Sequence, residues 1–337
     1  MNEPILAKKA RRTYKESRVV KGAGSSTRGT VQYVRRRVPI HILRGFCMGV
    51  ADIIPGVSGG TVALLLGIYD RLIEQISTAS SGISRLARGD IAGCKQRFRA
   101  VQWSFLASLL LGIALALLLL ASWLRTQIHE RPVIVSSAFF GVIAASAFAT
   151  RREVRKWAPP LYLVFGIFAV ATFTLLGIRS GSLENPAPLV AVCAGAIAIC
   201  AMILPGISGS FILLMLGLYD HLIAALEQRD VSVLGMYAIG ALVGLVLFSR
   251  VLNRLLNRYR DLVVSILLGL MVGSLRVLWP WPSDQGGLEN TGLGTPQTEE
   301  LFGASIAALA GVAAVVVILA LVVHRENFDS DDALEMP

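Results

Sequence analysis

The sequence predicts an all-α integral membrane protein, built as an inverted repeat of two halves that each hold a re-entrant helical hairpin and three transmembrane helices. Three observations lead to this prediction. The 337 residues are 54% hydrophobic and only 16% charged, a composition that soluble domains do not have. Apolar runs long enough to cross a bilayer, about 20 residues each, recur about six times. One apolar segment with a Pro-Gly pair inside it occurs twice.

The duplicated segment reads ADIIPGVSGGTVALLLGIYDRLI over residues 51–73 and AMILPGISGSFILLMLGLYDHLI over residues 201–223. The two copies are offset by 150 residues without a gap and share 13 of 23 residues. A helix breaks at Pro-Gly, because proline removes a backbone donor and glycine adds conformational freedom. Each copy therefore predicts two half-helices that meet at membrane depth, which is tolerated only where protein or a wet cavity surrounds them.

Basic residues in short loops predict the orientation of the chain. We expect a cytoplasmic position for the N-terminal tail and for the Lys/Arg-rich stretches 71–102, 150–157 and 250–260. The connections 125–131, 179–188, 221–232 and 280–302 are poor in basic residues and are expected outside. The first hairpin then enters and leaves from the cytoplasmic face, and the second from the external face. The alternative, that each copy is one full span, fits these charges less well.

Three spanning helices are predicted after each hairpin. In chain order they cover residues 103–124, 132–150 and 160–178, then 233–249, 261–279 and 303–324. An odd number of spans reverses the orientation of the second half. Small residues recur at one spacing in the middle span of each half, which predicts close helix packing and supports a duplication. They are Ser137, Gly141 and Ser146 in the first half, and Ser265, Gly269 and Ser274 in the second.

The predicted parts of the chain are a basic disordered cytoplasmic tail (1–38), the first transmembrane repeat (39–179), the second inverted repeat (180–325) and a short cytoplasmic tail (326–337). Up to Arg37 the chain holds eleven basic and two acidic residues, so this tail carries most of the net charge of +10. We expect it to contact anionic membrane lipids. Binding of nucleic acid is not expected, because aromatic residues do not interleave with the charges. Oligomerisation stays open.

Cysteine and histidine do not predict a metal site or a disulfide framework. The four cysteines form no CxxC pair and the four histidines are scattered. The sequence also lacks the GxxxxGK[ST] pattern of a nucleotide-binding loop. We therefore expect no cofactor, no metal and no nucleotide hydrolysis.

Each Pro-Gly-x-Ser-Gly turn predicts an anion site. The first N–H groups of the second half-helix have no partner inside that helix, and the helix dipole adds positive potential there. Glycines permit close approach of a ligand and hydroxyls add donors, which suits a phosphate or a carboxylate. The alternative is that the turns only pack. The substrate-binding residues predicted here are Pro55, Gly56, Ser58, Gly59, Gly60 and Thr61, and Pro205, Gly206, Ser208, Gly209 and Ser210.

Charged residues near the turns are functional candidates, because charge inside a membrane is costly. Arg44 and Arg276 are predicted to contact the phosphate, with snorkelling to lipid headgroups as the alternative. Asp52 is a candidate for proton coupling or for pairing with an arginine. The pairs Tyr69-Asp70 and Tyr219-Asp220 are expected to mark helix ends at the membrane interface.

Three motifs resemble the signature segments of the bacterial polyprenyl-phosphate translocases (the PopT family, formerly a domain of unknown function). They are GVADIIPGVSGGTVALLLGIYDRLI, CAMILPGISGSFILLMLGLYDHLI and GSLRVLWPW, and the resemblance covers about residues 40–325. It implies a multi-pass protein of the bacterial cytoplasmic membrane, with both termini cytoplasmic. It also implies transport of undecaprenyl phosphate or a similar carrier from the outer to the cytoplasmic leaflet, which sustains peptidoglycan and other envelope polymers. By resemblance, residues 55–61, 205–210 and Arg276 lie in functional motifs.

Two other functions remain open. Undecaprenyl-pyrophosphate phosphatase resembles this plan, but it carries an arginine directly after the turn serine, where this sequence has Gly59 and Gly209. The adjacent apolar helices also lack the paired carboxylates that acid–base catalysis needs, so we expect no enzyme. A transporter of a small anionic solute would use the same helix-end site. A purely structural membrane protein is disfavoured by the duplicated broken helices. Proton coupling is a hypothesis that rests on the missing nucleotide site.

Overall fold

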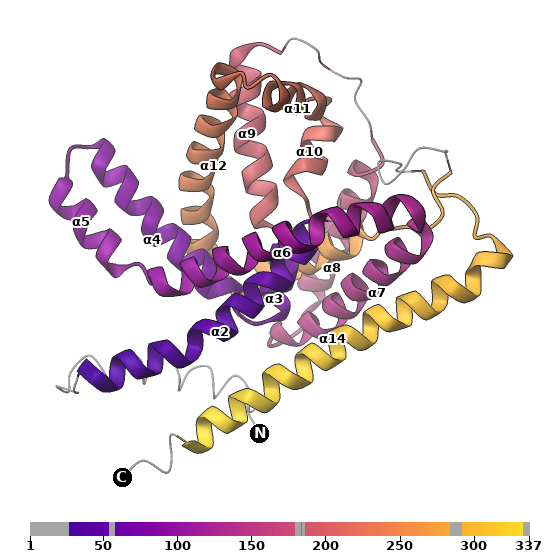
Figure 1. Ribbon diagram of the computed structural model, residues 1–337, viewed down its shortest axis with the longest axis horizontal. Helices are drawn as coiled ribbons and strands as arrows, with labels where there is room; N and C mark the ends of the chain where they lie inside the picture. The colour runs from indigo at the N-terminus through magenta and orange to yellow at the C-terminus, as the bar shows by residue number, and fades with distance from the viewer. Residues whose placement is uncertain (1–26, 54–57, 179–182, 184–185, 284–291, 333–337) are drawn as a thin grey trace.

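The computed structural model describes residues 27–53, 58–178, 183, 186–283 and 292–332, and within these ranges it is helical without any strand (Figure 1). The predicted all-α class is therefore confirmed. In chain order the helices are α2 (Thr27–Asp52), α3 (Gly59–Leu65), α4 (Tyr69–Ala87), α5 (Ile91–Ala100), α6 (Trp103–Glu130), α7 (Pro132–Thr150), the 3-10 turn η1 (Arg151–Glu153), α8 (Pro159–Leu175), α9 (Pro188–Ile203), α10 (Gly209–Met215), α11 (Tyr219–Glu227), α12 (Val231–Arg258), α13 (Arg260–Ser274) and α14 (Thr298–Asp332).

Four helices in the described part of the chain are long and apolar enough to cross a membrane: α6, α7, α12 and α14. They coincide with four of the six predicted spans. α8 and α9 are apolar but shorter, with 17 and 16 residues. The chain is thus a multi-pass membrane protein.

The predicted span over residues 261–279 is wrong in its extent. α13 has 15 residues and is about 22 Å long, which is less than the hydrocarbon thickness of about 30 Å. It ends at Ser274, whose hydroxyl donates to the carbonyl oxygen of Met271 at 2.8 Å, and the chain then turns through Leu278. Val264 and Met271 are completely buried, so α13 is a core helix and not a lipid-facing one.

The predicted disordered tail also needs a correction. α2 begins at Thr27, so residues 27–38 are helical, and residues 1–26 lie outside the described ranges. The stretch 30–38 contains neither glycine nor proline, and Pro39 is accommodated inside the helix. At the other end α14 continues to Asp332, into the predicted C-terminal tail.

The helices break where the duplicated segments predict. α2 ends at Asp52 and α3 begins at Gly59, while α9 ends at Ile203 and α10 begins at Gly209. Pro55 and Gly56 lie outside the described residues. α10 folds back along α9, because the start of α10 at Gly209 lies against the carbonyl oxygen of Ala198.

Helix pairing repeats between the two halves. α2 packs on α6 as α9 packs on α12, and α7 packs on α14 as α13 packs on α8. Figure 1 shows α9 to α12 grouped together, with α14 lying beside α7. Glycines stand at all four crossings, where a side chain would overlap a backbone carbonyl of the partner helix, as expected for close packing in membranes. They include Gly45, Gly112, Gly195 and Gly240, and also Gly141 and Gly269, for which the predicted packing role is confirmed.

A glycine turn links the short helix of each half to the next helix. Gly67 and Gly217 have φ of +66° and +69°, the left-handed conformation in which glycine closes helix ends. The N–H of Ile68 bonds to the carbonyl of Ala63, and the N–H of Leu218 bonds to that of Leu213. α10 and α11 meet there at 111°. The shared Leu-Gly-x-Tyr-Asp sequence is thus the sequence of a sharp turn.

We predict that the α9–α12 crossing is sensitive to one methyl group. Gly240→Ala places a Cβ on the carbonyl oxygen of Val192 and should lower stability by about 1–3 kcal/mol through overpacking. Gly235 lies on the same helix with nothing within 4 Å of such a Cβ. Gly235→Ala should therefore be neutral or stabilise by up to about 1 kcal/mol. Thermal unfolding in detergent measures both, and equal effects would contradict the packing.

Candidate functional site

Three segments far apart in the sequence meet at the helix breaks. Leu275 and Leu278, which follow α13, pack with Ala51 and Ile53 beside the first break. Between them in the sequence, Val277 packs on Phe211 of α10. The segment that carries Arg276 therefore lies between the two breaks.

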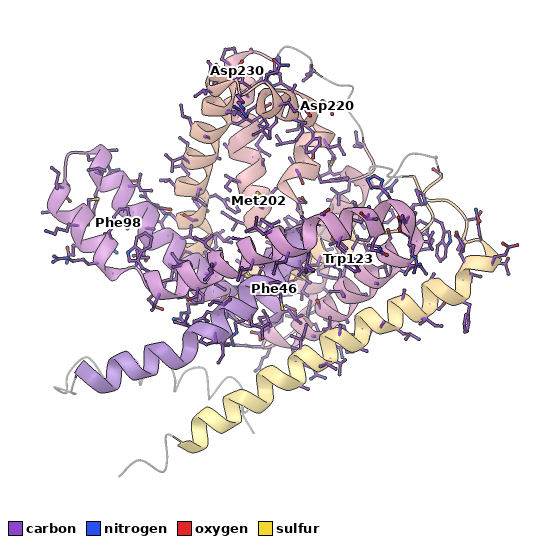
Figure 2. All side chains as sticks on the ribbon, viewed as in Figure 1. Phe46, Phe98, Trp123, Met202, Asp220 and Asp230 are labelled. Carbon is purple, nitrogen blue, oxygen red and sulfur yellow. The ribbon has the colours of Figure 1, made fainter. Side chains whose placement is uncertain are left out.

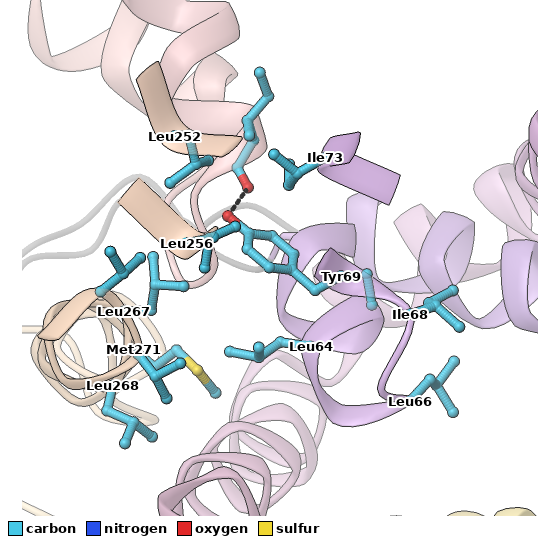
Figure 3. Close-up of a cluster of buried hydrophobic side chains, with 14 of the residues drawn as sticks. Leu64, Leu66, Ile68, Tyr69, Ile73, Leu252, Leu256, Leu267, Leu268 and Met271 are labelled. Carbon is cyan, nitrogen blue, oxygen red and sulfur yellow. Dashed lines mark hydrogen bonds between the residues drawn. The ribbon is translucent and has the colours of Figure 1, made fainter. Parts of the chain in front are cut away.

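Hydrogen bonds join the two breaks directly. The Thr61 hydroxyl oxygen accepts the N–H of Gly206 at 2.8 Å. The Ser58 hydroxyl donates to the carbonyl of Met202 at 3.2 Å. The Tyr69 hydroxyl donates to the carbonyl of Ile203 at 3.0 Å, inside the buried cluster drawn in Figure 3. Side chains of the first half thus bind backbone groups at the end of α9 and in the turn after it. We call these three bonds the turn latch.

Gly206 is required at its position for two reasons. Its φ is +86°, which disfavours residues with a side chain. A Cβ there would also lie 2.7 Å from Cα of Met271. Glycine therefore lets the second turn pack against α13 while its N–H reaches Thr61.

Side chains of Asp52 and Ser58 cap the start of α3. Asp52 accepts the N–H of Gly59 at 2.6 Å, and the Ser58 hydroxyl accepts the N–H of Gly60 at 3.1 Å. Ser58 and Thr61 are 2% and 0% exposed. The first N–H groups of α3 consequently have partners, and both predicted hydroxyls are buried.

The second turn differs from the first. Ser208 precedes α10 but its side chain makes no capping bond to the helix. Its hydroxyl lies 2.8 Å from that of Ser210. Ser208 is half-buried and Ser210 is exposed, whereas Pro205 and Gly209 are buried. Of the two turns, the second presents the more accessible hydroxyls.

Arg276 brings a positive charge near the start of α10. It is half-buried, and its guanidinium carbon lies 4.8 Å from the centre of the Phe173 ring in α8. Gly177 makes room for the guanidinium, because a Cβ there would lie 2.6 Å from it. The neighbouring contact of Val277 with Phe211 links this charge to the start of α10.

Comparison with known proteins places these segments in one family. A family profile described as undecaprenyl phosphate translocase-like matches residues 48–292. The chain belongs to this family. A polyprenyl-phosphate transporter of Vibrio cholerae is 38% identical over 241 residues, covering 71% of this chain and 77% of the relative. One of Staphylococcus aureus is 29% identical over 261 residues, covering 72% of this chain and 86% of the relative. No solved structure gives a significant match.

Two further predicted site residues, Arg44 and Asp52, lie on α2. Arg44 lies before the family match, and it precedes Gly45, where α2 crosses α6. It is about 12 Å before Asp52 along the helix axis. Asp52 is exposed and caps α3 through Gly59.

Tyr69 and Asp70 begin α4, and Tyr219 and Asp220 begin α11, so the expectation that both pairs mark helix ends is confirmed. Tyr69 and Asp70 also contact the second half of the chain. Tyr69 is 2% exposed and belongs to the turn latch. Asp70 pairs with Arg260 at 3.0 Å, and the same guanidinium pairs with Glu153 at 2.9 Å. Both residues thus tie α4 to the second half of the chain. The signal in the sequence was the tyrosine itself, which occurs in both copies of the apolar segment although burial of its hydroxyl needs a partner.

We predict that the turn latch stabilises this member of the family. Thr61→Val leaves the buried N–H of Gly206 without an acceptor and should cost about 1–3 kcal/mol. Thr61→Ser keeps the hydroxyl and serves as the matched control. The free energy of unfolding in a mild detergent–denaturant series measures the difference. A loss in the valine variant no larger than in the serine variant would contradict the latch, because valine keeps the methyl group of Thr61 and lacks only the hydroxyl.

Proposed function

We propose that the protein transports undecaprenyl phosphate, or a similar polyprenyl phosphate, from the outer to the cytoplasmic leaflet. The observation that carries the proposal is the meeting of two broken helices and the Arg276 segment inside a multi-pass membrane protein. The names of the two relatives, both polyprenyl-phosphate transporters, support the same substrate class. The product then serves synthesis of peptidoglycan and other envelope polymers on the cytoplasmic side.

The membrane arrangement that we propose is an inverted repeat in the bacterial cytoplasmic membrane, with both termini cytoplasmic. The equivalent helix pairs of the two halves support the duplication. The return of α10 along α9 supports a re-entrant hairpin. Basic residues are concentrated in the stretches assigned to the cytoplasm, which supports the orientation.

We propose that the second turn holds the phosphate while the turn latch is formed. Ser208 and Ser210 supply hydroxyl donors, and Arg276 supplies a charge whose hydrogen bonds to an anion are stronger than neutral ones. The hydroxyls of the first turn, those of Ser58 and Thr61, are engaged in the turn latch. They reach a phosphate only when the two turns separate.

Such a site addresses the main cost of the transport step. An isolated charge is expensive to bury in hydrocarbon, while the isoprenoid chain is at home there. Donors near the helix breaks replace the water of the phosphate as the head group passes. Inward movement also opposes an inside-negative potential, by about 2.3 kcal/mol per charge per 100 mV.

The test uses the purified protein in liposomes with polyprenyl phosphate and, separately, its pyrophosphate. Exposure of the head group in each leaflet is followed over time. Arg276→Gln should slow translocation about 10- to 100-fold, because one charged hydrogen bond is lost, and Ser208→Ala with Ser210→Ala should slow it as well. Arg254→Gln is the matched control, since Arg254 is exposed at the end of α12, and it should keep the rate of the unchanged protein.

Two results would replace the proposal. Release of inorganic phosphate from the pyrophosphate would identify an enzyme. Binding of soluble phosphate esters in place of the lipid, with no movement of lipid between leaflets, would identify a carrier of small anions. Unchanged translocation in the Arg276 and serine variants would support the transport function but contradict the proposed phosphate site.

Proton coupling is a further part of the proposal, with Asp52 as the titrating group. A phosphate monoester titrates near pH 6, so a more acidic outside places more of the singly charged form at the outer leaflet and favours inward transport. Translocation should fall when the pH gradient is collapsed by an ionophore. Asp52→Asn keeps an acceptor for the N–H of Gly59 and should remove the response to the gradient. A rate that is the same with and without the gradient in the unchanged protein rules the coupling out.

A further inference from the structure

The hairpin formed by α4 and α5 belongs to the first half and packs through α4 on α12. It extends from the side of the helix bundle, next to the start of α6 (Figure 1). Gly89 closes α4 with φ of +77°, and the N–H of Asp90 bonds to the carbonyl of Arg85 at 2.9 Å. The Asp90 carboxylate then caps α5 by accepting the N–H of Gly93 at 2.7 Å. The turn is therefore fixed on both sides.

An aromatic side chain holds the two helices of the hairpin together. Phe98 of α5 lies against Gly82 of α4, where a Cβ would be 2.7 Å from the ring, and it points into the hairpin in Figure 2. On its other side it stacks on Trp103, with ring centroids 5.9 Å apart. Phe98 thus connects the hairpin to the first residue of α6.

The turn and the second helix of the hairpin are strongly basic. Between residues 85 and 103 the chain holds five basic residues and one acidic residue, Asp90. Asp90 is already used, because it caps α5 and pairs with Arg85 at 2.9 Å. The hydrogen bond from the N–H of Gly93, together with Arg85, lowers the pKa of Asp90 below its ordinary value. The remaining basic side chains are all exposed: Arg88, Lys95, Arg97 and Arg99.

Two large apolar side chains interrupt this charge at the tip. Leu86 and Ile91 flank the turn and are 55% and 71% exposed. Ile91, Lys95 and Arg99 follow one another at intervals of four residues, so they lie along one face of α5. An exposed face that combines apolar and basic side chains is typical of helices that lie on anionic membranes.

The position of the hairpin along the chain brings it to the level of the headgroups. α6 is the longest apolar run of the first half and begins at Trp103, which is 51% exposed. Exposed tryptophan at the end of a span marks the membrane interface. α5 ends three residues earlier, at Ala100, and is only about 15 Å long. Its basic side chains therefore lie within about one or two Debye lengths of the lipid surface.

We propose that the α4–α5 hairpin binds the anionic lipid surface. Leu86 and Ile91 insert among the headgroups, while Arg88, Lys95, Arg97 and Arg99 contact the lipid phosphates. Charge complementarity favours anionic lipid as the partner, because Asp90, the only acidic group between residues 85 and 103, is engaged within the hairpin. This inference does not depend on the proposed transport function.

The test attaches a fluorophore to the hairpin of the full chain and measures its quenching by a neutral molecule in water. A fluorophore is attached at Ala92→Cys, an exposed position beside Ile91, with the four native cysteines replaced by alanine. The protein is reconstituted in phosphatidylcholine alone or with phosphatidylglycerol, and acrylamide quenching is measured. We expect less quenching in the anionic vesicles. Each basic residue removed should lower the docking equilibrium constant about fivefold.

Charge-matched variants separate the hairpin from general electrostatics. Replacing Arg88, Lys95, Arg97 and Arg99 by glutamine should make quenching equal in both lipids. Changing the three arginines of this set to lysine should preserve the protection and shows that the substituted hairpin still folds. The control removes the same charge elsewhere on the surfaces expected to be cytoplasmic, by changing four exposed residues to glutamine, and should keep the protection: Arg152, Lys156, Arg254 and Arg258.

Three outcomes would overturn the proposal. Equal quenching of the unchanged hairpin in both lipids would show that it does not dock. Loss of protection in the control variant would assign the effect to net charge. Protection that appears only when an acidic polypeptide such as polyglutamate is added would identify a protein partner instead of lipid. Hydrogen–deuterium exchange of residues 85–102 in the unlabelled protein provides the second readout, in which anionic lipid should slow exchange.

Discussion

The turn latch is the constraint on which the rest of this fold depends. Each helix break leaves backbone donors and acceptors without partners inside their helix, and in hydrocarbon each such group costs several kcal/mol. The break after α9 is satisfied by the first half, through Ser58, Thr61 and Tyr69. The end of α9 therefore has its buried backbone partners only when the first half is in place. Gly60 lets the start of α3 lie close to the carbonyl oxygen of Ile203.

The latch also explains why two similar segments differ in detail. At the position of Thr61 the second copy has Phe211, which packs with Leu176 and Val277 instead of bonding to a turn. At the position of Gly60, which packs close to the carbonyl of Ile203, the second copy has Ser210, which is exposed. One copy has become the half that holds the breaks together. Under the proposed function the other copy is left to present its hydroxyls to the substrate.

The sequence was sufficient to predict the features that follow from local physics. Proline, glycine and apolar run length predicted the helical class, both breaks and four spans, and the small residues Gly141 and Gly269 predicted close packing. Features set by contacts between distant segments were not predictable in this way. α13 has the apolar composition of a span, but it ends early because the chain turns there to pack between the two breaks. Tyrosine is typical of membrane interfaces. Tyr69 is part of the core because its hydroxyl finds a partner in the carbonyl of Ile203, which the sequence does not reveal.

α4 shows how the parts of the structure are coupled. It belongs to the first half in sequence, yet it packs on α12 of the second half, where Ser80 faces Ser249 at 3.1 Å and Arg250 bonds to the carbonyl of Ser80 at 2.6 Å. Its first turn carries Tyr69 of the latch, and its far end leads through the basic turn into α5. Under the proposed function, separation of the two turns must therefore also strain the packing of α4 on α12. Net hydrogen bonds contribute about 1 kcal/mol each, so a latch of three bonds is strong enough to favour the joined turns and weak enough to leave a minor separated state populated. Under the proposed function, a carrier that releases its phosphate on the other side needs a contact of this intermediate strength.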